Sequence, residues 1–230
     1  MTFDAAGTLF AVAEPVGATY ARCAARHGIR LDANPLAETF AAAFHAAPSL
    51  AFPGTSGNRL AERERAWWHA LVRAAFGGAA AAPGFDACFA ELFAHYADGA
   101  AWRVFPEVPA VLTALRARGL RLAVVSNFDG RLPGLLAALG LGPRFDAVVY
   151  SSRAGAAKPS PAIFAHALAT LGVPADAAVH VGDSIDADVG GACAAGLRAV
   201  LVDRGVAHGA VPASVAVLPS LAALPALLQQ

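Results

Sequence analysis

Polar side chains follow several short apolar runs of the chain, and the first of these side chains is a candidate nucleophile. Asp4 comes directly after Thr2 and Phe3 and is followed by Gly7 and Thr8. Glycine permits a tight turn and a threonine hydroxyl can hydrogen-bond a carboxylate, so this segment could present Asp4 as an attacking group. Taken alone, the segment favours an ordinary aspartate at the start of a turn.

A second group of carboxylates lies in one segment near residue 185. Asp183 follows Gly182 at the end of an apolar run, and Asp188 falls in the first turns of the next predicted helix, from where it can fold back toward Asp183. Asp186, between them, is expected to face solvent near the helix N-terminus, where negative charge is favourable. Carboxylates of this kind suit a hard cation, and magnesium commonly takes one or two of them together with a substrate phosphate.

The chain contains sixteen arginines and a single lysine, and we interpret that lysine, Lys158, as functional. It precedes Pro159, which favours an extended or turn conformation, and a predicted helix begins just after it. A lysine held there can act as a point charge toward a phosphate or a carboxylate. Ser126 and Asn127, after another apolar run, offer a hydroxyl, an amide and backbone donors that orient phosphate oxygens.

These polar segments need a parallel sheet to bring them together. Brief apolar runs, typical of strands covered on both faces, alternate with helical segments such as Val108–Arg118 and Pro161–Leu171. The predicted strands are Thr2–Phe3, Leu122–Val125, Ala147–Tyr150, Ala178–Val181 and Ala199–Val202. Ligands of such sheets bind beyond the carboxyl ends of the strands, so strands that end in Asp4, Ser126 and Asp183 predict one shared site.

The stretch from about Glu14 to Gly99 shows no convincing strand pattern. It is predicted to form helices separated by glycine and proline: Pro15–His27, Pro35–Ala46, Arg59–Phe76 and Phe85–Tyr96. We therefore predict an α/β protein with a Rossmann-like, doubly wound parallel sheet core, residues 1–13 and 100–230, and an inserted all-helical cap domain, residues 14–99. Trp67 and Trp68 are interpreted as residues that pack inside the cap or between the cap and the core, rather than as part of a substrate site. Asp129 is interpreted as the N-cap of a helix from about Gly130 to Leu139.

Composition excludes several classes of protein. Seventeen basic and seventeen acidic side chains give no net charge, which argues against a nucleic-acid-binding or polybasic membrane protein. No run of about 18 apolar residues lacks proline, glycine or a charge, so no membrane-spanning helix is expected. Three scattered cysteines, Cys23, Cys88 and Cys193, without metal-ligand spacing indicate a reduced setting. We expect a cytoplasmic monomer or homodimer with no nucleic-acid or membrane partner.

Four segments, in this order, resemble the motifs of the haloacid dehalogenase superfamily of hydrolases: Asp4-x-Ala6-Gly7-Thr8-Leu9, Ser126-Asn127, Lys158-Pro159, and Gly182-Asp183-Ser184 with Asp188. The helical stretch after the first motif resembles the cap of subfamily I. The run from Val125 to Leu132, the Trp67-Trp68 pair and Ala101-Trp102 are similar to the group of the haloacid dehalogenase-like hydrolase domain-containing protein 3 and the rhythmically-expressed-gene protein. The resemblance covers essentially the whole chain, and its motifs are specific to the superfamily, not to a substrate.

The resemblance implies a phosphatase-type hydrolase that acts on a small phosphorylated molecule. Asp4 would attack the phosphorus and form an aspartyl-phosphate, while Thr8, Ser126 and Asn127 hold the phosphoryl group and Lys158 balances its negative charge. This chemistry depends on positioning and positive charge.

The same resemblance implies a magnesium cofactor. Asp4, Asp183 and the backbone carbonyl of Ala6 would bind Mg²⁺, with Asp188 in support. The carboxylate segments described above are thereby assigned to one metal site.

Ala6 departs from the pattern of the resembled phosphatases, which usually carry a second aspartate at this position as a general acid and base. Such a group contributes roughly 100- to 10,000-fold to the rate, so its absence makes turnover of ordinary alkyl phosphates doubtful. Glu14, His27, His45 and Arg59 are candidates, by type alone, for a replacement from the cap.

Two other functions also fit the absence of a general acid at Ala6. The chain could be a phosphate-binding pseudoenzyme, or a metal-free 2-haloacid dehalogenase, although such dehalogenases generally lack the aspartate equivalent to Asp183. Phosphonoacetaldehyde hydrolases need a cap lysine, and the stretch from Glu14 to Gly99 contains none.

Overall fold

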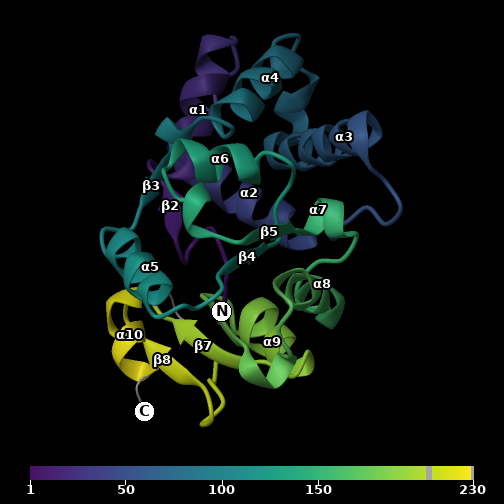
Figure 1. Cartoon of the computed structure of the whole chain (residues 1–230). Coiled ribbons are helices and arrows are strands. Elements are labelled where there is room, and N and C mark those ends of the chain that lie inside the picture. Colours follow the sequence, from purple (N-terminus) through teal and green to yellow (C-terminus); the bar gives the residue numbers. More distant parts are fainter. Residues whose placement is uncertain (206–208, 229–230) are drawn as a thin grey trace.

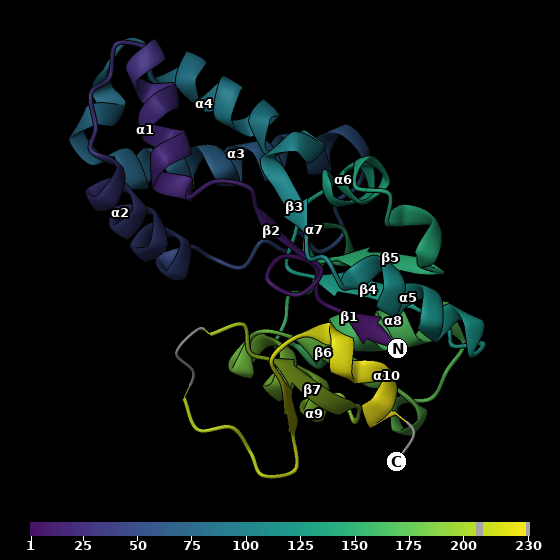
Figure 2. The same cartoon turned by 90° about the vertical axis from the view of Figure 1, so that its left-hand side faces the viewer.

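The computed structural model describes residues 1–205 and 209–228 of the 230-residue chain. Four helices gather at one end of the molecule, and a sheet with its flanking helices forms the other end (Figures 1 and 2). The four helices are α1 (Val16–Arg26), α2 (Ala33–Ala46), α3 (Gly57–Phe76) and α4 (Phe85–His95). We call residues 14–99 the helical region and the remainder of the chain the sheet region. Whether the two are separate domains, as the sequence predicts, stays a prediction.

The central sheet is parallel and runs in the order β5-β4-β1-β6-β7-β8 within the described residues. Its strands are β1 (Thr2–Phe3), β4 (Ala123–Ser126), β5 (Ala147–Tyr150), β6 (Val179–Gly182), β7 (Arg198–Val202) and β8 (Ala216–Leu218). The chain adds β4 and β5 on one side of β1 and then β6, β7 and β8 on the other. The strand order therefore reverses beside β1, and the predicted α/β, doubly wound fold is confirmed.

Both faces of the sheet are covered, which explains the continuous apolar strands. Val124 of β4 packs in one cluster with α5 (Val108–Ala117), α6 (Leu132–Ala138) and α10 (Leu224–Leu227). The next residue, Val125, packs in another cluster with α8 (Pro161–Leu171) and α9 (Gly191–Ala194). Because successive strand side chains point to opposite faces, a strand between two helical layers needs apolar residues at every position.

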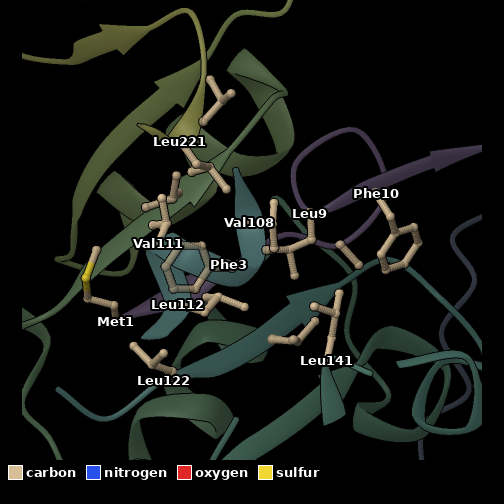
Figure 3. Packing of buried hydrophobic residues seen from close by; sticks show 14 of the residues in the cluster. Met1, Phe3, Leu9, Phe10, Val108, Val111, Leu112, Leu122, Leu141 and Leu221 are labelled. Atoms are coloured by element: carbon tan, nitrogen blue, oxygen red, sulfur yellow. The ribbon is translucent and has the colours of Figure 1, made fainter. Parts of the chain in front are cut away.

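The shortest strand of the sheet is anchored by its burial at the centre. Phe3 of β1 is fully buried and lies with Val111 and Leu112 of α5 in the main core (Figure 3). Complete burial of such a side chain stabilises the fold by about 1.5–3 kcal/mol. This packing fixes the residue that precedes Asp4, so the position of Asp4 is set by the core itself.

The remaining elements are short. A separate antiparallel pair, β2 (Phe10–Val12) with β3 (Trp102–Val104), joins the segment after Asp4 to the segment that follows the helical region. One more helical turn is α7 (Ser151–Ala154), and the 3-10 helices are η1 (Gly77–Ala81), η2 (Gly99–Ala101), η3 (Gly142–Arg144), η4 (Ala175–Ala177) and η6 (Leu221–Ala223). A single π-helical turn, η5 (Ile185–Gly190), precedes α9. The sequence patterns predicted none of β2, β3 and β8, which have only three residues each.

One predicted cap was wrong. The helix expected from about Gly130 begins at Leu132, and its N-cap position is Arg131. Asp129 instead accepts a hydrogen bond from the backbone N–H of Arg131 in the turn before the helix. Among the residues that the structure describes, no helix combines the length and the apolar character that a membrane span requires.

Candidate active site

The carboxyl ends of three neighbouring strands bring the predicted site residues together. Asp4 follows β1, Ser126 ends β4, and Asp183 follows β6, so all three lie at the central strands where the strand order reverses. This is the place where open parallel sheets bind ligands. The hydroxyl of Ser126 makes no hydrogen bond to any part of the chain that the structure describes, so it is available to a ligand.

Lys158 is the centre of a buried ionic cluster. Its ammonium nitrogen lies 2.5 Å from Asp4 Oδ1 and 2.5 Å from Asp188 Oδ1, and only 2% of its side chain is exposed. Unpaired charges are costly to bury, so a lysine in this position must keep its two carboxylate partners. The structure thus brings together three residues that are separated by up to 184 positions in the sequence.

The electrostatic balance differs between the two carboxylates that hold Lys158. Burial raises the pKa of Asp4 to about 6, against the opposing effect of the Lys158 charge, and Asp188 and Asp183 nearby raise it further. For Asp188, burial would raise the pKa, but Lys158 and His180 outweigh burial and hold the pKa far below its usual range. Burial would also lower the pKa of Lys158, and the two carboxylates outweigh it and raise the pKa instead. Lys158 and Asp188 are therefore charged in the folded protein.

His180 is a supporting residue that sequence reasoning missed. Its Nε2 lies 2.9 Å from Asp188 Oδ1, and its Nδ1 lies 2.8 Å from the hydroxyl of Thr2. Burial lowers the pKa of His180, against the opposing effect of Asp188, so the ring is neutral. The ring then donates through Nε2 to Asp188 and accepts through Nδ1 from Thr2. The sequence feature that could have revealed His180 is a histidine inside an otherwise apolar strand.

Asn127 holds the backbone of Lys158 in place. Its side-chain Nδ2 donates to Lys158 O at 2.9 Å, and its Oδ1 accepts from Lys158 N at 2.7 Å. The amide of Asn127 is thus engaged with the protein, and its side chain positions Lys158. Two groups of this segment make no hydrogen bond to the described part of the chain and remain free to bind a ligand. They are the backbone N–H of Asn127 and the hydroxyl of Ser126.

The turn after Asp4 is shaped by close packing around Asp183. Gly7 has φ +94°, and a Cβ there would overlap the Asp183 carboxylate, so glycine is required. The hydroxyl of Thr8 donates to Asp183 Oδ1 at 3.3 Å. Arg204, which the sequence reading did not single out, donates to Gly7 O and to Thr8 O at 3.1 and 2.9 Å.

Asp4, Asp183 and Asp188 form a group that could hold a metal ion. One carboxylate oxygen of each lies within 4.8 Å of the others. Burial raises the pKa of Asp183, and the Asp188 charge adds to that effect. Three carboxylates face one lysine, and this excess of negative charge and hard oxygen ligands fits a divalent cation such as magnesium.

A large apolar cavity opens beside Ala6 and Asn127. It has a volume of about 390 Å³ and lies between the sheet region and helices of the helical region. Its walls include aromatic side chains from all four of those helices: Tyr20, Phe40, Phe44, Trp67, Trp68, Phe89 and Phe93. None of Glu14, His27, His45 and Arg59, the candidates for a replacement acid, is among the described residues that line it.

A polar contact that sequence reasoning did not predict joins the helical region to the sheet region. Glu64 of α3 is buried, accepts from the Ser152 hydroxyl, and accepts from Gly130 N at 3.0 Å. Trp68 donates from Nε1 to Asp129 Oδ2 at 2.5 Å. Burial raises the pKa of Glu64, and the charge of Asp129 adds to the effect. These contacts hold α3 against the segment that follows β4 and against α7.

The cysteines are less scattered in space than in sequence. Cys23 and Cys88 are buried between α1 and α4 with their sulfur atoms 3.5 Å apart, and His27 and Glu91 lie beside Cys23. Glu91 is already engaged by Arg26 and His27. Burial raises the pKa of Cys23 to about 12, so this thiol stays protonated and packs as an apolar group.

Comparison with known proteins gives a family match that covers most of the chain. A family model described as haloacid dehalogenase-like hydrolase matches residues 1–196. The human haloacid dehalogenase-like hydrolase domain-containing protein 3 is 36% identical over 235 residues, which span 99% of this chain and 92% of that protein. A plasmid-encoded phosphoglycolate phosphatase of Cupriavidus necator is 42% identical over 166 residues, covering 69% of this chain and 71% of that protein.

Solved structures share the architecture as well. The crystal structure of a 2-haloacid dehalogenase from Pseudomonas syringae pv. Tomato DC3000 is 28% identical, with a TM-score of 0.66 over 99% of this chain and 96% of that chain. Both phosphatases and dehalogenases are therefore among the proteins that this chain resembles.

Proposed function

The chain belongs to the haloacid dehalogenase-like hydrolase family, and we propose that it is a magnesium-dependent, phosphatase-type member that acts on a small phosphorylated molecule through Asp4. The observation that carries the proposal is the contact of Asp4 Oδ1 with Lys158 Nζ at 2.5 Å. Lys158 orients one oxygen of Asp4 and leaves the second for attack. The same ammonium group lies where negative charge would build up during phosphoryl transfer.

The carboxylates that would hold magnesium are Asp4 and Asp183, together with the backbone carbonyl of Ala6. Asp188 is already engaged by Lys158, by His180 and by Ser184 N at 2.9 Å, which favours a role in positioning Lys158 over direct contact with the ion. When bound, magnesium would neutralise the charge of the phosphoryl group. It would also offset the repulsion between that group and Asp4.

In the proposed reaction, an oxygen of Asp4 attacks the phosphorus, and the bond from phosphorus to the leaving oxygen breaks. Lys158, the Ser126 hydroxyl and the Asn127 backbone N–H hold the phosphoryl oxygens, while Thr8 keeps Asp183 in place. Water then attacks the phosphorus of the aspartyl-phosphate, which releases inorganic phosphate and restores Asp4. Ala6 supplies no proton to the leaving group, so the first step depends on how readily that group leaves as an anion.

Steady-state assays with acetyl phosphate, with magnesium or with a chelator, test this function. We expect turnover that requires magnesium and that is lost in Asp4→Asn, a variant of nearly the same size that cannot form the acyl phosphate. Full activity of Asp4→Asn would contradict the nucleophile assignment. Tight binding of phosphate with no turnover of any activated substrate would instead identify a phosphate-binding pseudoenzyme.

Dehalogenation is the second candidate function, favoured by Ala6 and by the likeness to the Pseudomonas syringae dehalogenase. Asp183 argues against it, because its carboxylate lies with Asp4 and Asp188 in the group that fits a cation. Chloride release from 2-chloropropionate that a chelator leaves unchanged would support dehalogenation over phosphoryl transfer.

A further inference from the structure

We infer that the substrate is a phosphate ester of an apolar phenol, whose aromatic body occupies the cavity beside Ala6. The inference rests on the proposed function, because it concerns the leaving group of the same phosphoryl transfer. Its basis is the combination of an apolar cavity with the lack of an effective acid among the described residues of its walls.

The cavity is continuous with the site of phosphoryl transfer. Ala6 lies two residues after Asp4, Asn127 follows Ser126, and Ala157 precedes Lys158, and all three line the cavity. A phosphoryl group held at Asp4 would therefore direct its leaving group into this space. The volume of about 390 Å³ falls within the range of pockets that bury most of a small organic ligand.

The walls offer few polar partners for a ligand. The side-chain hydroxyls among the described lining residues are those of Ser49, Tyr20 and Tyr96, and the Tyr96 hydroxyl is buried without a hydrogen-bond partner in the described part of the chain. All three indole N–H groups are already used, since Trp67 donates to Pro48 O, Trp68 donates to Asp129, and Trp102 donates to Tyr96 O. A polar leaving group would lose its contacts with water here and find little replacement. An aromatic body, by contrast, gains from burial against aromatic walls.

The single charged side chain among the described lining residues is Arg131, and it is neutralised. Its guanidinium donates to both carboxylate oxygens of Asp129, to Phe93 O at 3.1 Å, and lies 4.2 Å from the centre of the Phe93 ring. A carboxylate on the substrate would therefore find no free cation in the cavity. This disfavours phosphoglycolate, the substrate named for one of the relatives.

No described residue of the cavity wall is an effective acid. The lining contains no aspartate, glutamate, histidine, lysine or cysteine. Burial raises the pKa of Tyr96 to about 12 and raises that of Tyr20 as well, so both phenols hold their protons tightly. The leaving oxygen must depart as an anion and take its proton from solvent later. Phenols, with pKa values of about 10, leave in this way far more readily than alkyl alcohols.

A series of substrates separates this inference from the proposed function. Acetyl phosphate, which has a small leaving group, reports phosphoryl transfer at Asp4 alone. For phenyl, 4-ethylphenyl and 4-butylphenyl phosphate we expect kcat/KM to rise roughly fourfold for each added methylene until the cavity is filled. The kcat/KM for phenyl phosphate should exceed that for cyclohexyl phosphate by about 100-fold, because cyclohexyl phosphate has a similar shape but an alkyl leaving group.

Phe44 provides a matched pair of variants, because half of its surface is exposed and its replacement need not unfold the chain. Phe44→Arg places a charge at the cavity rim and should lower the ratio of kcat/KM for 4-butylphenyl phosphate to that for acetyl phosphate by about tenfold. Phe44→Leu should keep this ratio close to that of the unaltered protein.

The outcomes are distinct. Turnover of acetyl phosphate with no rise along the alkylphenyl series, or a preference for phosphoglycolate, overturns the inference and leaves the proposed function standing. Loss of turnover for every phosphate, acetyl phosphate included, overturns the proposed function itself.

Discussion

The side-chain amide of Asn127 bonds to both polar groups of the Lys158 backbone, donating to its carbonyl at 2.9 Å and accepting from its N–H at 2.7 Å. The loop that carries the only lysine of the chain is thereby tied to the end of β4. The position of the ammonium group against Asp4 depends on this pair of bonds.

Replacing Asn127 by alanine should therefore lower kcat for acetyl phosphate by about 100-fold, the size of effect expected when a reacting group is displaced by an ångström. KM should change much less, because the phosphoryl-binding backbone stays. The check is a double-mutant cycle with Lys158→Ala. If Asn127 acts through Lys158, replacing Asn127 should lower kcat little further in the Lys158→Ala background. Additive losses of kcat in the double variant would contradict that role.

The raised pKa of Asp4, about 6, predicts a pH-dependent stability difference between the unaltered protein and Asp4→Asn. Between about pH 4 and about pH 6, the folded protein keeps a proton on Asp4 that the unfolded chain has released, so this group's contribution to stability is present at low pH and is lost as the pH rises. Thermal unfolding in the presence of a chelator measures it. The unaltered protein should lose stability relative to Asp4→Asn across this window, and a constant difference would contradict the raised pKa.

Ala6→Asp tests the missing proton donor directly. A carboxyl group at this position should raise cyclohexyl phosphate hydrolysis by about 100-fold and phenyl phosphate hydrolysis by much less, since only the alkyl leaving group needs the proton. Ala6→Asn, of the same size but without the acid, is the control. Equal gains for both esters would mean that leaving-group protonation is not the element that the site lacks.

Glu64→Ala should destabilise the protein by about 1–3 kcal/mol, because Ser152 and the backbone N–H of Gly130 lose their buried acceptor. Urea unfolding followed by circular dichroism gives the free energy of unfolding. Glu62→Ala, at an exposed position of the same helix, is the matched control and should change it little. Similar losses in the two variants would assign the effect to helix propensity and not to the contact between the regions.

The sequence allowed the residues at the strand ends to be predicted, because Asp4, Ser126 and Asp183 each follow an apolar run and parallel strands share one carboxyl edge. It did not reveal what those groups contact. The engagement of the Asn127 amide with Lys158, and of Asp188 with His180, depends on side-chain directions that a pattern of residue types does not specify.

The sequence also did not predict contacts between segments that lie far apart in the chain. Glu64 and Ser152 are 88 positions apart, and nothing in the surroundings of either residue indicates the other. Strands β2, β3 and β8 were missed because three residues are too few to establish an alternating pattern. Helix α8 was predictable for a different reason, because Ser160 caps its N-terminus and Gly172 ends it.

The tryptophans in the cavity walls make ligand binding measurable by fluorescence. The chain has three tryptophans, Trp67, Trp68 and Trp102, and all of them line this one space. Intrinsic indole fluorescence of the unmodified protein therefore arises entirely from the cavity, with no contribution from remote tryptophans. An aromatic product or a nitrophenyl quencher that enters the cavity would change this fluorescence, so its binding could be measured without a label on the protein.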